Sequence, residues 1–242
     1  MNNNVTPYND QTTSKKEQVA TMFNNIAPKY DFLNQLLSMG IHKGWRRKAV
    51  QLLKGNNPKT ILDIATGTGD FAIEAMKLNP DKVVGVDISE GMLKFGVVKI
   101  NKLGLQNKIE LKLGDSENLP FSDNSFDAIT VGFGVRNFEN LEKGINDIYR
   151  VLSPNGLVSI LEFSKPRKFP IKQIYHFYFR FVTPLIGKTF SKDSSAYTYL
   201  PESVKAFPDG EDFLNVLRKS GFKDSKAIPV SFGIASIYVA RK

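Results

Sequence analysis

From residue 60 onward, short apolar runs alternate with longer stretches in which apolar residues recur at helical spacing. The short runs have the length and composition of buried strands, and the longer stretches have the period of amphipathic helices. We predict strands at residues 60–64, 82–86, 109–113, 126–131 and 157–163, with helices starting at Asp70 and over 90–102 and 141–152. Because a repeated strand–helix–strand order implies parallel strands, the pattern predicts an α/β fold with a mostly parallel, doubly wound sheet.

The start of the chain departs from this alternation. Apolar residues at helical spacing predict helices over 16–25 and 43–54, ahead of the first strand. We expect residues 15–55 to form an N-terminal helical cap whose helices act as a lid. Residues 1–14 are polar and carry no apolar secretory signal, so we expect a flexible tail.

Residues 164–207, beyond the last parallel strand, are rich in aromatic side chains. Arg180 and Pro184 interrupt this stretch, which is therefore not expected to cross a membrane. Some of its rings can pack against the sheet, and the others are expected to face a ligand or a lipid surface. We interpret it as an aromatic insertion on the substrate side of a single domain spanning residues 15–242. The chain then closes with a helix over 211–219 and an antiparallel hairpin of strands 222–228 and 234–240.

The loop after the first strand, Asp63 to Asp70, carries the first chemical signal. Its glycines let the backbone turn tightly and approach a ligand, and Asp87 after the second strand is placed to hold ribose hydroxyls. A dehydrogenase is the alternative, but its pyrophosphate needs a third glycine and would be repelled by Asp70. The loop favours a ligand with ribose hydroxyls and an ammonium group but no phosphate, as in S-adenosylmethionine.

The composition of the chain excludes some kinds of site but does not indicate a function. The 242 residues are 41% hydrophobic and 24% charged, which is the balance of an ordinary globular domain. The chain has no cysteine and two histidines, so it has no thiol nucleophile or disulfide, and we expect no metal. The net charge of +9 favours an acidic partner, either nucleic acid or an anionic lipid surface. The alternative is that the lysine side chains only solvate the protein surface.

Three further motifs cover segments outside the loop. They are Tyr30–Trp45, Gly132–Asn137 and Arg150–Pro166. With them the chain resembles, over nearly its whole length, the UbiE/MenG family of quinone-biosynthesis C-methyltransferases. This resemblance implies the class I S-adenosylmethionine-dependent methyltransferase fold. The chain departs from the family pattern at Leu33, Gly132, Ser153 and Asn155, where the family commonly has methionine, serine, lysine and glycine.

The resemblance also implies which residues bind the cofactor. Asp87 can accept hydrogen bonds from the ribose hydroxyls, and Asp115 from the adenine amine with Ser116 beside it. The Asp115-Ser116 pair could instead only form a turn, and Asp63 could brace the loop rather than lie near the ammonium group. The expected cofactor-binding residues are Asp63, Gly67, Thr68, Gly69, Asp87, Asp115 and Ser116.

Methylation of a ring carbon requires ionisation of the neighbouring hydroxyl. Arg136 stays protonated, so it could stabilise a phenolate or orient a water, and Asn137 could hold that water or a quinol oxygen. A salt bridge between Arg136 and Glu139 or another surface acid is the structural alternative. His42 and Tyr30 are the other catalytic candidates, although a histidine in this context could be structural. The substrate-binding candidates are Tyr197 and Tyr199.

The resemblance predicts transfer of the S-adenosylmethionine methyl group to a ring carbon of demethylmenaquinol, giving menaquinol. The alternatives are C-methylation of a benzoquinol in the ubiquinone pathway, an RNA methyltransferase, and a non-catalytic cofactor-binding subunit. We expect an isoprenoid quinol as the partner and no nucleic acid, and make no prediction of oligomeric state. The absence of cysteine suits a reducing compartment, and we expect a cytoplasmic protein. Aromatic side chains beside basic ones suggest peripheral contact at the inner face of the membrane.

Overall fold

The computed structural model describes residues 5–183, 185, 193 and 195–242. Its centre is a seven-stranded sheet in the order β3-β2-β1-β4-β5-β7-β6. All neighbouring strands pair in parallel except β7, which is antiparallel to both β5 and β6. The strands are β1 (Thr60–Ile64), β2 (Lys82–Asp87), β3 (Ile109–Leu113), β4 (Phe126–Gly132), β5 (Leu152–Phe163), β6 (Lys223–Val230) and β7 (Ala235–Arg241).

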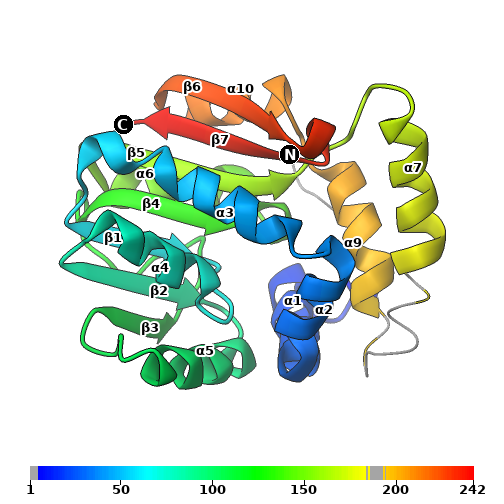
Figure 1. The fold of residues 1–242 in the computed structure, drawn as a ribbon, viewed down its shortest axis with the longest axis horizontal. Helices are drawn as coiled ribbons and strands as arrows, with labels where there is room; N and C mark the ends of the chain where they lie inside the picture. The colour runs from blue at the N-terminus through cyan, green and yellow to red at the C-terminus, as the bar shows by residue number, and fades with distance from the viewer. Residues whose placement is uncertain (1–4, 184, 186–192, 194) are drawn as a thin grey trace.

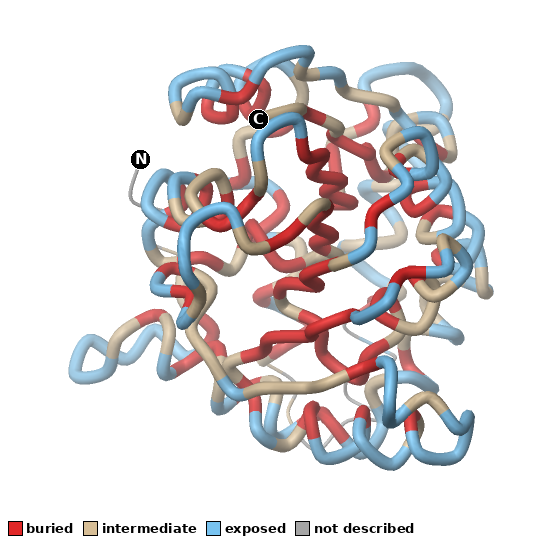
Figure 2. The backbone as a smooth tube through the Cα atoms, turned by 90° about the vertical axis from the view of Figure 1, so that its left-hand side faces the viewer, coloured by how far each residue is buried: buried red, intermediate tan, exposed pale blue. Residues whose placement is uncertain are grey.

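Helices cover both faces of the sheet (Figure 1). Residues of α6 and α10 share an apolar cluster with one face of β1, β4 and β5, while α3, α4 and α5 pack on the other face. Figure 2 shows the buried residues concentrated along the strands and on the inner sides of the helices. These helices are α3 (Ile41–Gln51), α4 (Asp70–Ala75), α5 (Glu90–Lys102), α6 (Leu141–Val151) and α10 (Glu211–Lys219). The predicted α/β class, parallel sheet and closing hairpin are confirmed.

A second group of helices lies beside the carboxyl ends of the parallel strands, at the right of Figure 1. Three of them share an apolar cluster of their own, which includes Met22, Leu33 and Tyr199. The group consists of α1 (Lys15–Ile26), α2 (Tyr30–Ser38), α7 (Ile171–Phe177) and α9 (Ser195–Ala206), with the short turns η1 (Ala27–Lys29) and η5 (Tyr178–Val182). Ligands of open α/β sheets bind at this edge, so the helices enclose the region where a site is expected.

Several element boundaries differ from the sequence prediction. The predicted helix over 43–54 begins earlier, at Ile41, and ends at Gln51. Strand β5 begins at Leu152, directly after α6, rather than at the predicted residue 157. The predicted turn at residues 153–156 forms an irregularity within this strand, where Asn155 has a left-handed φ of 64°. Phe126 pairs with Leu152 but Ala128 already pairs with Leu157, so the extra residues loop out of the ladder.

The two segments predicted outside the core are only partly described. Residues 1–4 of the predicted tail, and residues 184, 186–192 and 194 of the aromatic insertion, lie outside the described residues. In the described part of the tail, Tyr8 N–H donates to Gln18 Oε1 on α1 at 3.0 Å. Among the described helices, none is long and apolar enough to cross a membrane.

Candidate active site

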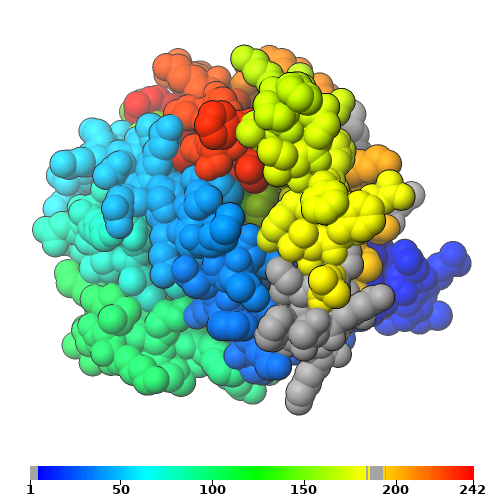
Figure 3. Space-filling model, turned by 45° about the vertical axis from the view of Figure 1, so that its right-hand side comes forward, coloured from blue at the N-terminus to red at the C-terminus, as the bar shows by residue number. Residues whose placement is uncertain are grey.

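Two adjoining cavities lie at the carboxyl ends of β1, β2 and β4. The smaller, of about 60 Å³, is lined by carboxylates, including Asp87 and Asp115, by Ser116, and by apolar side chains such as Ile88 and Met92. The larger, of about 350 Å³, is lined mainly by apolar and aromatic side chains. Figure 3 shows the surface hollowed where α3, α7 and the turn η6 (Ser231–Gly233) meet, and residues of all three line the larger cavity. The residues that line both cavities are Phe23, Tyr30, Ala65, Gly67, Gly132 and Phe133.

The loop after β1 turns sharply into the smaller cavity. Ala65, Gly67 and Gly69 have positive φ angles of 53°, 57° and 79°, which glycine adopts without strain. The Gly67 N–H donates to the Asp87 carboxylate at 2.7 Å, and Ser89 N–H donates to its other oxygen at 2.8 Å. Burial raises the pKa of Asp87. Each carboxylate oxygen has a further lone pair, so Asp87 can still accept from a ligand hydroxyl.

Asp63 is wholly buried and lines neither cavity. Its two oxygens accept from the hydroxyls of Thr66, at 2.6 Å, and Thr130, at 2.7 Å. Burial raises its pKa to about 7, although both hydroxyls oppose the shift. This is the loop-bracing arrangement that the sequence left open, with Asp63 joining the loop to β4.

Asp115 and Ser116 lie on the wall of the smaller cavity, as their position after β3 suggests. One Asp115 oxygen accepts from the Glu117 N–H at 2.9 Å, so the pair also forms a turn. The other accepts from Lys16 Nζ of α1 at 2.5 Å. A cofactor that donates a hydrogen bond to this carboxylate therefore either shares the carboxylate with Lys16 or displaces the Lys16 ammonium from it.

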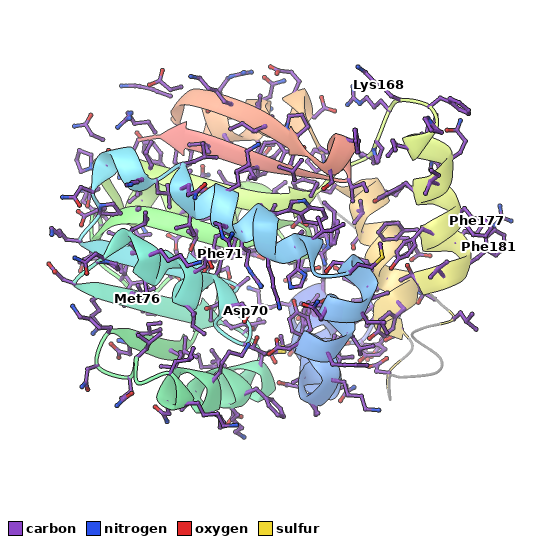
Figure 4. All side chains as sticks on the ribbon, in the orientation of Figure 1. Asp70, Phe71, Met76, Lys168, Phe177 and Phe181 are labelled. Atoms are coloured by element: carbon purple, nitrogen blue, oxygen red, sulfur yellow. The ribbon has the colours of Figure 1, made fainter. Side chains whose placement is uncertain are left out.

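Thr68 lines the larger cavity rather than the smaller one. Its hydroxyl donates to Asp31 at 2.7 Å and accepts from Lys99 Nζ at 2.9 Å. Lys99 also pairs with Asp70 at 2.7 Å, and Arg46 pairs with the other oxygen of Asp70 at 2.7 Å. Burial acts against ionisation of Asp70, but the two cations lower its pKa. This network joins α2 and α3 to the start of α4, where Figure 4 labels Asp70.

Gly132 and Phe71 explain one departure from the family pattern. Gly132 lines both cavities. A Cβ atom at this position would lie 2.6 Å from a ring carbon of Phe71, which is closer than Cβ contacts normally are. The chain therefore has glycine where the family commonly has serine because the Phe71 ring occupies that space.

Arg136 and Glu162 form a buried ion pair. Arg136 NH1 donates to the Glu162 carboxylate at 2.9 Å and also to the Phe133 carbonyl. Burial raises the pKa of Glu162, and Arg136 opposes that shift. The suggested salt bridge between Arg136 and Glu139 is wrong, because Glu139 accepts from the Lys15 N–H and Arg136 pairs with an interior carboxylate.

Arg136 and Asn137 are neighbours in the short turn η4 (Val135–Asn137) but face different cavities. Arg136 lines the larger cavity and Asn137 the smaller. Lys15 of α1 anchors this turn. Its buried ammonium donates to the carbonyl groups of Arg136, at 3.3 Å, and Phe138, at 3.0 Å. The turn therefore reaches both sides of the boundary between the cavities.

His42 and Tyr30 lie on α3 and α2 at the wall of the larger cavity. His42 Nδ1 is hydrogen-bonded to the Ser38 hydroxyl. Burial and the nearby Arg46 lower the pKa of His42 to about 4, so its ring is neutral near pH 7. Tyr30 lies on the shared wall, packs edge-on against Phe23 and has its pKa raised by burial.

Tyr197 and Tyr199, the predicted substrate contacts, are buried on α9 and line the larger cavity. The sequence prediction did not single out Tyr175 on α7, which lines the same cavity, or Glu162. Tyr175 belongs to the aromatic stretch, where composition alone cannot say which ring faces inward. Glu162 belongs to the motif Arg150–Pro166, and its place in a strand among apolar residues was the available signal.

The chain is similar to known proteins along almost its full length. The profile of the ubiE/COQ5 methyltransferase family matches residues 11–242. The chain belongs to this family. A Bacteroides fragilis relative called demethylmenaquinone methyltransferase is 50% identical, over 98% of this chain and 97% of the relative. A Geobacter sulfurreducens relative called ubiquinone/menaquinone biosynthesis C-methyltransferase UbiE is 44% identical, over 95% of this chain and 90% of the relative.

Solved structures agree with the family assignment at the level of the fold. A SAM-dependent methyltransferase from Thermotoga maritima has a TM-score of 0.63 and covers 92% of this chain and 99% of that chain. Its sequence identity of 17% supports the shared fold alone. The protein is thus a methyltransferase of the ubiE/COQ5 family, and the family and fold together imply S-adenosylmethionine as its methyl donor.

Proposed function

We propose that the protein transfers the methyl group of S-adenosylmethionine to a ring carbon of demethylmenaquinol, giving menaquinol. The observation that carries this proposal is the contact of two unlike cavities through one shared wall. The carboxylate-lined cavity suits a nucleoside with hydroxyl and amine donors, and the larger apolar one suits a greasy aromatic acceptor. The name of the 50% identical relative supports a naphthoquinol as that acceptor.

The donor set of the smaller cavity fits S-adenosylmethionine. Asp87 would accept from the ribose hydroxyls, Asp115 from the adenine amine, and Gly67 would allow the backbone to approach the ligand. Gly69 lines neither cavity and would act through the turn of the loop. The bound cofactor supplies an electrophilic methyl group on a positively charged sulfur. Asp63 acts indirectly in this proposal, because its hydrogen bonds to Thr66 and Thr130 keep the loop in its turned conformation.

The larger cavity would hold the quinol ring next to the shared wall. There the Arg136 guanidinium would stabilise negative charge on a ring oxygen, which raises the nucleophilicity of the neighbouring carbon. Asn137 would hold a water or a ring oxygen from the other side of the turn. His42 is neutral near pH 7 and would orient the ring or its oxygen through a hydrogen bond. Tyr197 and Tyr199 would enclose the head group.

The apolar helices around the cavity would exclude water from the reaction. Helices α1, α2 and α9 pack together through Met22, Leu33 and Tyr199 over the edge of the sheet. Transfer of a methyl group from a sulfonium to a phenolate removes both charges, so a dry site that orients the two reactants favours the reaction. This is the lid role expected of the N-terminal helices.

We further propose that the outer side of α7 and η5 contacts the surface of an anionic membrane. Phe177 and Phe181 are 61% and 55% exposed and project from the body of the protein in Figure 4, while Tyr175 and Phe179 of the same segment line the larger cavity. The Arg180 guanidinium lies 5.5 Å from the Phe181 ring centroid. Aromatic and basic side chains together are typical of peripheral membrane contacts.

Vesicle sedimentation tests the membrane contact. We expect the double variant Phe177→Ser/Phe181→Ser to bind anionic vesicles at least about tenfold more weakly than the parent protein, since two rings lose apolar contact. Phe95→Ser is the matched control, because Phe95 is 44% exposed on α5. Equal vesicle binding by the double variant and the parent protein would exclude this surface.

A methyl-transfer assay tests the enzymatic proposal. The purified protein is incubated with methyl-labelled S-adenosylmethionine and, separately, reduced demethylmenaquinone, a reduced benzoquinol precursor and bulk RNA. We expect label in the naphthoquinol product. Label in the benzoquinol alone would move the protein to the ubiquinone pathway, and label in RNA alone would refute quinol methylation. Cofactor binding without any transfer would indicate a non-catalytic subunit.

A further inference from the structure

Three buried hydrogen-bonding atoms, on residues that line the larger cavity, have no partner among the described residues. They are the hydroxyl oxygens of Tyr175 and Tyr199 and the Nε atom of Arg136. Buried polar atoms are nearly always hydrogen-bonded, and leaving one unpaired costs stability. An unpaired group that faces a cavity therefore indicates that a ligand supplies the partner.

These three groups come from separate elements that meet at one side of the cavity. Arg136 belongs to η4, Tyr175 to α7 and Tyr199 to α9. The Arg136 guanidinium lies 5.5 Å from the Phe163 ring centroid, Phe163 packs edge-on against Phe179, and the Phe179 and Tyr175 ring centroids are 4.4 Å apart. Helix α9, which carries Tyr199, packs against η4, which carries Arg136. Three distant segments of the chain therefore bring unpaired polar atoms to one region of an otherwise apolar cavity.

All three groups act as hydrogen-bond donors at neutral pH. The arginine Nε–H is a donor and not an acceptor, and burial raises the pKa of both Tyr175 and Tyr199, so both phenols keep their protons. The nearby acceptor, Glu162, is already bonded to Arg136 and to the Phe163 N–H. The missing partner is thus an acceptor.

The charges around this region balance closely. Arg136 is compensated by Glu162, and Asp209 also acts on Tyr175. The rings of Phe133 and Phe163 stack nearby with centroids 4.5 Å apart and keep the surroundings apolar. Among the described residues, the remaining titratable side chains that line the cavity are Tyr30, His42, Arg46, Asp70, Tyr178 and Tyr197.

We propose that Tyr175, Tyr199 and Arg136 Nε–H form an oxyanion site that binds one ring oxygen of the acceptor as a phenolate. The proposal rests on the proposed function, which supplies a hydroxylated ring as acceptor. The hydroxyl proton of the ring passes to bulk water on binding, and the three donors hold the oxygen that remains. The site thereby selects a ring with an ionisable hydroxyl next to the carbon to be methylated.

A coloured phenol tests the site without any turnover. The probe is 4-nitro-1-naphthol, whose anion absorbs visible light, titrated with the protein over a range of pH. Variants Tyr175→Phe and Tyr199→Phe keep each ring and remove only the hydroxyl. The control is Tyr149→Phe. Tyr149 lies on α6, packs against Phe222 and lines neither cavity.

We expect each of the two variants to bind the anionic probe about tenfold to a hundredfold more weakly, which is the effect of one hydrogen bond to a charged oxygen. The pKa of the bound probe then rises by about one to two units relative to the parent protein. The control is expected to match the parent. Variants that bind the anion as tightly as the parent would overturn the site.

The outcome is separable from that of the proposed function. If the protein methylates no quinol but Tyr175→Phe and Tyr199→Phe still weaken binding of the naphtholate, the site stands and the assigned reaction fails. If quinol methylation proceeds but neither variant changes anion binding or kcat, the function stands and the oxyanion site is refuted.

Discussion

The buried carboxyl group of Asp63 makes the stability of this protein depend on pH in an unusual direction. Its folded-state pKa is about 7, against an ordinary value of 3.8. The unfolded chain therefore binds fewer protons than the folded one between these values, so the free energy of unfolding falls as pH rises through that window. At about 1.4 kcal/mol per unit, the difference of roughly three units corresponds to a loss of order 4 kcal/mol by pH 8.

Asp63→Asn removes this ionisation but keeps most of the hydrogen bonding. The amide oxygen can accept from one of the two threonine hydroxyls, and the amide nitrogen can donate to the oxygen of the other. We expect the variant to be at or below parent stability at pH 5 and to become the more stable protein by a few kcal/mol near pH 8. Urea unfolding, followed by circular dichroism at several pH values between these limits, measures the difference.

Asp127 offers a matched control of opposite sign. Its carboxylate accepts from the Lys59 and Thr60 N–H groups, and although partial burial acts in the other direction, these bonds lower its pKa. Its contribution to stability is therefore present above the ordinary carboxyl pKa and lost in acid. We expect Asp127→Asn to lose stability at pH 5 to 8. A stability difference between Asp63→Asn and the parent that stays constant across pH would refute our account of Asp63.

Three further substitutions test the site. Asp87→Asn should raise the Kd of S-adenosylmethionine at least tenfold by calorimetry, while Asp81→Asn, on the exposed turn before β2, should leave it unchanged. Arg136→Ala should lower kcat at least a hundredfold. It should also lower stability by about 3 kcal/mol, because it leaves Glu162 buried without its partner. Adding Glu162→Gln should restore stability but not kcat, and a recovered kcat would argue against a role of Arg136 in the reaction. His42→Gln should keep the shape of the pH profile of kcat between about pH 5.5 and 8, because the histidine is neutral over that range. If the parent protein has an inflection near pH 6.5 that the variant loses, His42 titrates there and this account of it is wrong.

The sequence predicted the sheet well because each buried strand is a short apolar run with a clear end. The strands at Thr60–Ile64 and Ile109–Leu113 and the helix at Glu90–Lys102 have the predicted bounds, and Ser89 caps that helix as expected. The start of β5 could not be predicted in this way. Ser153 to Gly156 have turn composition and loop out of the ladder, and only the pairing of Leu152 and Leu157 with β4 on either side places them within the strand.

For the site, the sequence located residues but not their partners. Asp87 and Asp115 follow strands in the chain, so topology alone brings them to one cavity. The partner of Arg136 depends on how η4 packs against β5, which no local pattern records. The structural alternative to a catalytic role considered only surface acids, whereas the partner is the interior Glu162. Tyr175 was likewise one ring among many until the fold of α7 turned it inward.

The wall between the two cavities limits how this protein can vary. Tyr30, Gly67 and Phe133 line both cavities, so under the proposed function a change that refits either ligand also reshapes the surface met by the other. Adaptation to a bulkier acceptor at these positions would alter the affinity for the methyl donor at the same time. Under the proposed function, new acceptor specificity is more easily reached through Met39 and Ile174, which line the larger cavity alone and are 78% and 59% exposed.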